Sequence, residues 1–200
     1  MTSTIRLAQN PEADRLLTDN AFALLLGMQL DQQVPMEKAF TGPHELARRL
    51  CEAGRLDRVE ALSVESVAGL PQDELIDLFR RRPALHRFPE AMAKRAHQLA
   101  VLLVEQYGGD VERFWSEPDT GEQLMARLKQ LPGFGDGKAR IFLGLLGKQR
   151  GITPTGWREA AEPFGAEDTT ISVADIVDER SLIKVREHKK AMKQAAKAAG

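Results

Sequence analysis

The feature that most constrains the fold is a glycine-rich turn at residues 128–139, which runs LKQLPGFGDGKA. Before the turn, Leu124, Leu128 and Leu131 recur at helical spacing, and strong helix formers fill the positions between them. After the turn, apolar residues within 139–146 mark the buried side of another helix. Proline and glycine allow a tight reversal between the two, with positive φ where it is needed. The stretch therefore predicts a helix, a hairpin turn and a second helix.

The rest of the chain is also patterned for helices. A nearly all-apolar, central buried helix is expected around residues 22–28, and a long helix over residues 89–107. Gly42 and Pro43 predict a break between two shorter helices, and the arginine pair at 48 and 49 is expected on a solvated face. Strand patterns are nearly absent, so we expect an all-α fold formed by a single domain over residues 1–200.

The turn has the chemistry of an anion site. Gly133 and Gly135 leave backbone N–H groups uncovered, and the second helix begins just after them with its unpaired N–H groups and positive dipole end. Lys138 falls in the first turn of that helix, where a bound anion would offset an unfavourable cation. Asp136 is ambiguous, because it can cap the helix but would also repel a phosphate. A turn that binds nothing is the alternative, since short glycine patterns are weak signals.

Three motifs follow one another along the chain: AFALLLGMQLDQQV at residues 21–34, RFPEAMAKRA at residues 87–96, and the LPGFG hairpin at residues 131–135. They resemble, in order, the apolar helix with a Gln-rich turn, the following lysine-bearing helix and the hairpin of the helix-hairpin-helix–GPD superfamily of base-excision DNA glycosylases. The resemblance covers roughly residues 18–150. More closely, the chain is similar to a small family of actinobacterial-type helix-hairpin-helix–GPD base-excision repair proteins.

The resemblance implies a two-lobed, all-α fold with a cleft between the lobes. The hairpin unit would occupy residues 122–148. One lobe would hold about residues 30–150, and the other would join residues 1–29 to residues 151–200.

The resemblance also implies a set of residues that contact DNA. Double-stranded DNA would lie against the hairpin, and the Gln-rich turn would face an extruded nucleotide, with Gln33 at the matching position. A solvated turn between helices is the alternative for the two glutamines. The DNA-binding residues implied in this way are Gly133, Phe134, Gly135, Gly137, Lys138, Gln32 and Gln33.

The catalytic aspartate that the resemblance implies would stand at position 155, where this chain has Thr155. No Asp or Glu lies between Gly137 and Arg158, and a hydroxyl cannot stabilise a developing oxocarbenium charge as a carboxylate can. Asp31 is the candidate substitute because it borders the matching turn, although it can also be a plain solvated turn residue. The position of the family's Schiff-base lysine holds Gly137, so we expect monofunctional rather than lyase-coupled chemistry, with Lys138 on a phosphate.

Composition limits cofactors and partners. Cys51 is the only cysteine, which excludes an internal disulfide and a four-cysteine iron–sulfur cluster. The four histidines have no metal-ligand spacing, so no metal site is expected, and the resemblance implies at most a monovalent ion at the hairpin carbonyls. The formal net charge is −1, so DNA binding needs a local basic patch. The basic C-terminal tail is one candidate, with a solvated helix end as the alternative.

The sequence has no apolar run of about 18 residues and no signal-peptide pattern at its start. We therefore expect a cytoplasmic, nucleoid-associated monomer. Three functional hypotheses remain: a monofunctional DNA glycosylase with an altered catalytic acid, a non-catalytic binder of damaged or distorted DNA, and a helical protein that kept only the fold. The hairpin favours the first two.

Overall fold

The computed structural model describes the backbone of residues 4–198 and the side chains of residues 4–195. Over this part of the chain all the regular structure is helical, which confirms the predicted all-α class; a single isolated bridge joins Thr120 and Thr155. The α-helices are α1 (Pro11–Asp19), α2 (Ala21–Leu30), α3 (Met36–Glu52), α4 (Val64–Ala68), α5 (Gln72–Arg80), α6 (Pro89–Tyr107), α7 (Val111–Ser116), α8 (Gly121–Gln130), α9 (Asp136–Leu145), α10 (Trp157–Ala160) and α11 (Glu179–Ala198). The short turns are η1 (Val59–Ala61), the π-helical η2 (Leu146–Arg150) and η3 (Val173–Asp175).

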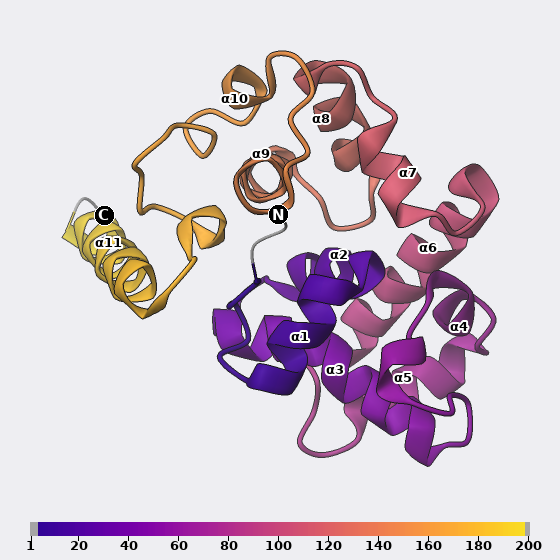
Figure 1. Ribbon diagram of the computed structural model, residues 1–200. Helices are drawn as coiled ribbons and strands as arrows, with labels where there is room; N and C mark the ends of the chain where they lie inside the picture. The colour runs from indigo at the N-terminus through magenta and orange to yellow at the C-terminus, as the bar shows by residue number, and fades with distance from the viewer. Residues whose placement is uncertain (1–3, 199–200) are drawn as a thin grey trace.

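Helix α2 lies near the centre of the molecule, as its nearly all-apolar sequence predicts (Figure 1). Every residue from Phe22 to Leu30 is buried, and the helix contacts α1, α3, α6 and α7. Two glycines allow α2 and α3 to approach closely. A Cβ at Gly27 would lie 2.8 Å from the Phe40 ring, and one at Gly42 would lie 2.6 Å from Leu30. Asn20 caps α2 by accepting the Ala23 N–H.

The predicted break at Gly42-Pro43 is wrong, because α3 continues through both residues from Met36 to Glu52. A proline inside a helix removes one backbone hydrogen bond, here the one that the Ala39 carbonyl would accept. Helix α3 packs against two neighbouring helices, α1 and α2. Burial of the continuous apolar face therefore outweighs the local cost of Pro43.

The predicted solvated arginine pair is correct for Arg48 and wrong for Arg49. The Arg49 side chain is 1% exposed, whereas that of Arg48 is 45% exposed. The buried guanidinium donates to four acceptors: Glu45 Oε1 at 2.7 Å and the carbonyl oxygens of Leu78, Arg81 and Pro83 at 2.5, 2.9 and 2.7 Å. Arg49 therefore caps the carbonyl groups at the C-terminal end of α5 and fixes the start of the loop that leads to α6 by hydrogen bonds.

The C-terminal half is built on the predicted hairpin of α8 and α9, which α10 covers (Figure 1). The close approach of α10 depends on Gly147, where a Cβ would lie 2.2 Å from the Trp157 ring. The chain before α10 also lies beside the start of α8. The Thr155 N–H donates to the Asp119 carbonyl at 3.0 Å, and the Gly121 N–H donates to the Thr155 carbonyl at 2.8 Å.

The loop between α10 and α11 is fixed by the buried carboxylate of Asp175. One of its oxygens accepts from Lys148 Nζ at 2.5 Å and from the Thr169 hydroxyl at 2.9 Å. The other accepts the backbone N–H groups of Ile171 and Ser172 at 2.9 and 3.0 Å. These bonds tie the loop to η2 and set the direction in which α11 leaves the body.

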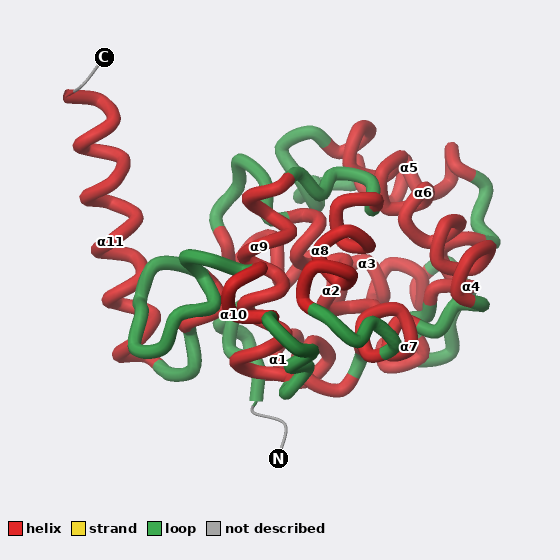
Figure 2. The backbone as a smooth tube through the Cα atoms, turned by 90° about the horizontal axis from the view of Figure 1, so that it is seen from above, coloured by secondary structure: helices red, strands yellow, loops and turns green. Residues whose placement is uncertain are grey.

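Helix α11 projects from the rest of the molecule (Figure 2). Among its side chains described in the structure, residues 179–195, the buried ones are those of Leu182 and Val185, in the first half of the helix. The apolar core is continuous and includes residues from Ile5 to Val185. The division into lobes of about 30–150 and 1–29 plus 151–200 stays a prediction. No helix in the described part of the chain is long and apolar enough to cross a membrane.

Candidate functional site

The hairpin turn presents the open N-terminus of α9 to solvent. Gly133 has φ +85°, the left-handed region that favours glycine, and Gly135 is the N-cap residue of α9. Gly135 and Gly137 are exposed, and a Cβ at either position would meet nothing within 4 Å. The first N–H groups of α9 are therefore accessible to a bulky anion such as a phosphate.

Asp136 does not cap α9, and its charge is compensated. Its carboxylate accepts from Lys129 Nζ at 3.2 Å and from Arg140 Nε at 2.7 Å, one residue on each side of the turn. The bonds from Arg140 and Lys129 lower the pKa of Asp136 below its ordinary value. The three side chains together carry one net positive charge, so Asp136 does not make the outer face of the hairpin repel phosphates.

Two of the predicted DNA-contacting hairpin residues point into the protein instead. Phe134 is 5% exposed and packs edge-on against Phe142, with ring centroids 5.9 Å apart. Lys138 Nζ lies 5.7 Å from the centroid of the Phe134 ring and donates to the Gln29 carbonyl at 2.7 Å. Lys138 therefore contacts the end of α2 and does not point toward the solvent-facing side of the hairpin.

Gln29 joins three elements at this place. Its side chain is fully buried, and Nε2 donates to the Pro132 carbonyl at 2.8 Å and to the Arg95 carbonyl at 3.1 Å. Its Oε1 has no hydrogen-bond partner among the described residues. Gln29 therefore connects α2 to the hairpin and to α6. The sequence signal for this role is a glutamine inside an otherwise apolar helix.

Asp31 follows directly, as the residue at the C-terminal end of α2. Burial raises the pKa of its carboxyl group, while the charges of Lys189 and Lys138 lower it and Glu37 adds to the rise. Burial likewise lowers the pKa of Lys138 to about 8, an effect that Asp31 opposes and Arg95 reinforces. Both side chains are half-buried, and ionisable groups with pKa values shifted by burial are typical of sites for proton transfer or charge stabilisation.

The Gln-rich turn is held by α6 and by the loop before it. Gln32 Oε1 accepts from Arg95 Nη1 at 2.8 Å, and its carbonyl contacts His86 Nε2 at 3.0 Å. Gln33 is exposed and has φ +57°. The structure therefore fixes Gln32 internally and leaves Gln33 as the glutamine available to a ligand.

Phe88 is an exposed aromatic residue beside the Gln-rich turn, and the sequence pattern did not predict it as a site residue. His86 Nδ1 accepts the Phe88 N–H at 3.0 Å, so Nε2 carries the proton that is donated to the Gln32 carbonyl. Burial lowers the pKa of His86, which favours this neutral form. The Phe88 ring is 44% exposed, with the Arg87 guanidinium 5.2 Å from its centroid. A large aromatic ring held in water beside the turn is a candidate for stacking on a base.

Thr155 lies apart from these residues. It lines a surface cavity of about 800 Å³ between α8, α9 and α10, together with Lys129 and Arg140. Asp31 does not line this cavity and lies at the C-terminal end of α2, next to the segment that Lys138 contacts. Thr155, at the position that the resemblance assigns to the catalytic aspartate, thus lies in a cavity that does not include Asp31, the substitute carboxylate.

The described residues contain no group of three or more His, Cys, Asp or Glu side chains that could hold a metal ion. Two hairpin carbonyls already accept internal hydrogen bonds. The Leu131 carbonyl accepts the Phe134 N–H at 3.0 Å, and the Pro132 carbonyl accepts from Gln29. These bonds give the expected monovalent ion no support, and it stays a prediction.

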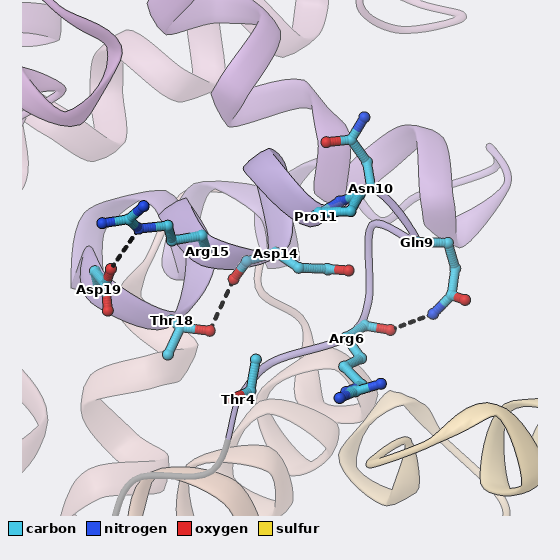
Figure 3. A pocket seen from close by; sticks show the side chains of 9 residues that line it. All are labelled: Thr4, Arg6, Gln9, Asn10, Pro11, Asp14, Arg15, Thr18 and Asp19. Carbon is cyan, nitrogen blue, oxygen red and sulfur yellow. Dashed lines mark hydrogen bonds and ion pairs between the residues drawn. The ribbon is translucent and has the colours of Figure 1, made fainter.

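A cavity of about 510 Å³ lies between residues 4–10 and α1 (Figure 3). Its polar groups bond to one another. The Thr18 hydroxyl donates to the Asp14 carbonyl at 2.7 Å, the Asp14 carboxylate accepts the Ala8 N–H at 2.8 Å, and Gln9 donates to the Arg6 carbonyl. The first two of these bonds fix the lead-in segment and the end of α1, and no buried side-chain atom without a hydrogen-bond partner occurs among the described residues that line the cavity.

The chain matches no protein-family model, no curated protein and no solved structure at a significant level. The resemblance to the helix-hairpin-helix–GPD superfamily therefore rests on the three sequence motifs.

The pKa of Lys138 can be tested through protein stability. Between about 8 and its ordinary value of 10.5, the amine binds more protons in the unfolded state than in the folded state. Stability therefore rises with pH across this window because of Lys138. The free energy of unfolding is measured by urea denaturation at pH 8 and pH 10. The difference between the wild type and Lys138→Gln should shift in favour of the wild type at pH 10. An equal change in stability between the two pH values for the wild type and Lys138→Gln would contradict the lowered pKa.

Proposed function

We propose that this protein is a base-excision DNA repair protein of the helix-hairpin-helix–GPD type, which binds duplex DNA through the α8–α9 hairpin and releases a damaged base as a monofunctional glycosylase. The observation that carries the proposal is the meeting of Lys138, from the first turn of α9, with the end of α2 that bears Asp31. The backbone-binding hairpin and the candidate catalytic carboxylate thereby share one structural unit, joined by Gln29.

The hairpin supplies the contact with the DNA backbone. The open N–H groups after Gly135 suit a phosphate, and Lys129 and Arg140 place positive charge on both sides of it. Such contacts position a protein on DNA without reading its sequence. This local patch fits a chain with a net charge of −1, because the overall charge cannot attract DNA.

Asp31 supplies the chemistry. Cleavage of the bond between base and sugar develops positive charge on the sugar, which a nearby carboxylate stabilises; alternatively, the carboxylate activates a water molecule. Lys138 and Lys189 favour the charged form of Asp31 against the effect of burial. Lys138 acts here as a positioning residue, because its amine is bound to the Gln29 carbonyl.

Phe88 and Gln33 supply the groups that accommodate an extruded base. An enzyme that acts on a base must take it out of the stack, and side chains that enter the duplex offset the cost. Phe88 projects an exposed ring, and the His86–Gln32 bond connects its loop to the turn that carries Gln33.

The hairpin contact is tested by Gly135→Asp. The new side chain has open space and an extended backbone with φ −81°, and Asp is a favourable N-cap residue, so the fold should be retained or slightly stabilised. A carboxylate at the mouth of the anion site should nevertheless weaken duplex binding at least tenfold, measured by fluorescence anisotropy at moderate salt.

Gly135→Asn is the matched control. It has the same size and the same capping ability but no charge, so its affinity should stay within a few-fold of the wild type. Equal affinity of Gly135→Asp and Gly135→Asn would remove the hairpin from the binding surface.

A non-catalytic binder of damaged or distorted DNA is the second candidate. The position of Thr155 favours it, because the carboxylate expected there is missing and the surrounding cavity is separate from Asp31. The two candidates share the hairpin test and differ only in base release.

A further inference from the structure

Helix α11 is a long basic helix, called the arm here, whose first half packs on the body of the protein. It has 20 residues, which corresponds to about 30 Å, and its buried anchors, Leu182 and Val185, lie in its first half. Within residues 186–195 every side chain is exposed except that of the half-buried His188. This segment extends about 15 Å beyond the anchors, and it projects from the body in Figure 2.

Basic residues form a stripe along this segment. At about 100° per residue, Arg186, Lys189, Lys190 and Lys193 fall within a sector of about 100°, whereas Lys184 lies on the opposite side. The spacing places like charges four residues apart, at 186 and 190 and at 189 and 193, which destabilises an isolated helix. An anionic partner along the stripe would remove this repulsion.

The stripe begins at the candidate site. Arg186 forms an ion pair with Glu37, six residues after Asp31. Lys138, from the hairpin side, donates to the Gln29 carbonyl at 2.7 Å, two residues before Asp31. The arm and the hairpin therefore contact the chain on both sides of Asp31, so a polyanion that crosses the site can reach both.

The apolar residues of α11 do not favour a membrane or an apolar protein groove. Ile183 and Met192 are 48% and 59% exposed. They are nine residues apart, which places them about half a turn from each other, so they do not form a continuous apolar face. The charged stripe is the feature that a partner would recognise.

We infer that α11 is a second DNA-binding element, in which Lys190 and Lys193 contact the phosphate backbone of the duplex on one flank of the damaged base. The inference rests on the proposed function. The free length of the arm, about 15 Å, corresponds to about four base pairs at about 3.4 Å each.

The test is the double variant Lys190→Gln/Lys193→Gln, which leaves the site neighbours Arg186 and Lys189 intact. Glutamine is a good helix former, so α11 should persist. The negative slope of log K against log salt concentration for an undamaged duplex should become shallower by about 2, because two phosphate contacts are lost. Removing about five base pairs from the contacted flank should weaken the wild type but not the variant.

The matched control is Arg180→Gln/Lys184→Gln, which changes the net charge equally and lies on the same helix outside the stripe. Its salt slope should equal that of the wild type, and Lys190→Arg/Lys193→Arg should restore the wild-type slope. Equal slopes for the Lys190→Gln/Lys193→Gln variant and its control would overturn the inference. If the wild type binds no duplex, the proposed function fails; if it binds and only Gly135→Asp weakens binding, the inference about α11 fails alone.

Discussion

Replacing Asp31 with asparagine is expected to lower the single-turnover rate of base release by on the order of 100-fold or more. Asparagine keeps the size of the side chain at the end of α2 and removes the charge that would stabilise the sugar cation. Duplex binding should change little, because the hairpin is intact. The measurement is release of damaged bases from a panel of defined duplexes, with affinity measured in parallel.

The pH dependence gives a second readout for Asp31. Burial raises its pKa above the ordinary value of 3.8, and the reaction requires the carboxylate form. Base release by the wild type should therefore decline as the pH falls through this raised pKa, and Asp31→Asn should lack that decline. Release by Asp31→Asn at the wild-type rate would exclude Asp31 as the catalyst.

Two further outcomes separate the candidate functions. A wild-type protein that binds these duplexes but releases no base would favour the non-catalytic binder. Thr155→Asp is expected to leave activity unchanged, because Thr155 lies in the cavity between α8, α9 and α10. Activity gained by Thr155→Asp in an inert protein would instead identify a glycosylase scaffold that has lost its acid.

Arg49→Met should cost about 3–5 kcal/mol in the free energy of unfolding. Methionine has a similar length but leaves the carbonyls of Leu78, Arg81 and Pro83 without their buried donor. The same substitution removes one of the bonds that lower the pKa of Glu45 to about 2, although Arg48 contributes the larger share. The measurement is urea denaturation at pH 7.

Arg48→Met is the matched control, because Arg48 is exposed and pairs with Glu45 and Glu52 at the surface. Exposed ion pairs contribute little, so the loss should stay below about 1 kcal/mol. Glu45 has a lowered pKa, so its stabilising effect is present above the ordinary value of 4.5 and is lost as the pH falls toward 2. The difference in free energy of unfolding between the wild type and Arg49→Met should therefore become smaller over that pH range. Equal losses of stability for Arg49→Met and Arg48→Met at pH 7 would show that burial of Arg49 adds nothing to stability.

The positions of most helices could be predicted from the sequence. Apolar periodicity and local punctuation place the hairpin helices and α6, which runs from Pro89 to Tyr107 as expected and stops at Gly108 with φ +63°. These signals act between residues close in the chain, where helix formation, capping and glycine turns are decided. The nearly all-apolar composition of α2 likewise predicted its burial, because apolar side chains surround the helix and no side of it is polar.

The tertiary structure decided the features that depend on distant residues. Pro43 stays helical because α3 packs on α1 and α2, and Arg49 is buried because the ends of α5 and of the following loop supply acceptors 29 to 34 residues away. The candidate site is the clearest case. Lys138 reaches Gln29 across 109 positions, and Gln29 reaches Pro132 across 103.

The sequence by itself therefore determined that the chain is helical, that it contains a glycine-rich hairpin, and that a carboxylate is absent at position 155. Only the folded structure decided that Lys138 turns inward, that Asp31 is half-buried at the end of α2, and that Phe88 stays exposed. The physical reason is that burial and charge environment depend on which surfaces meet after packing. Short-range periodicity carries no information about such partners.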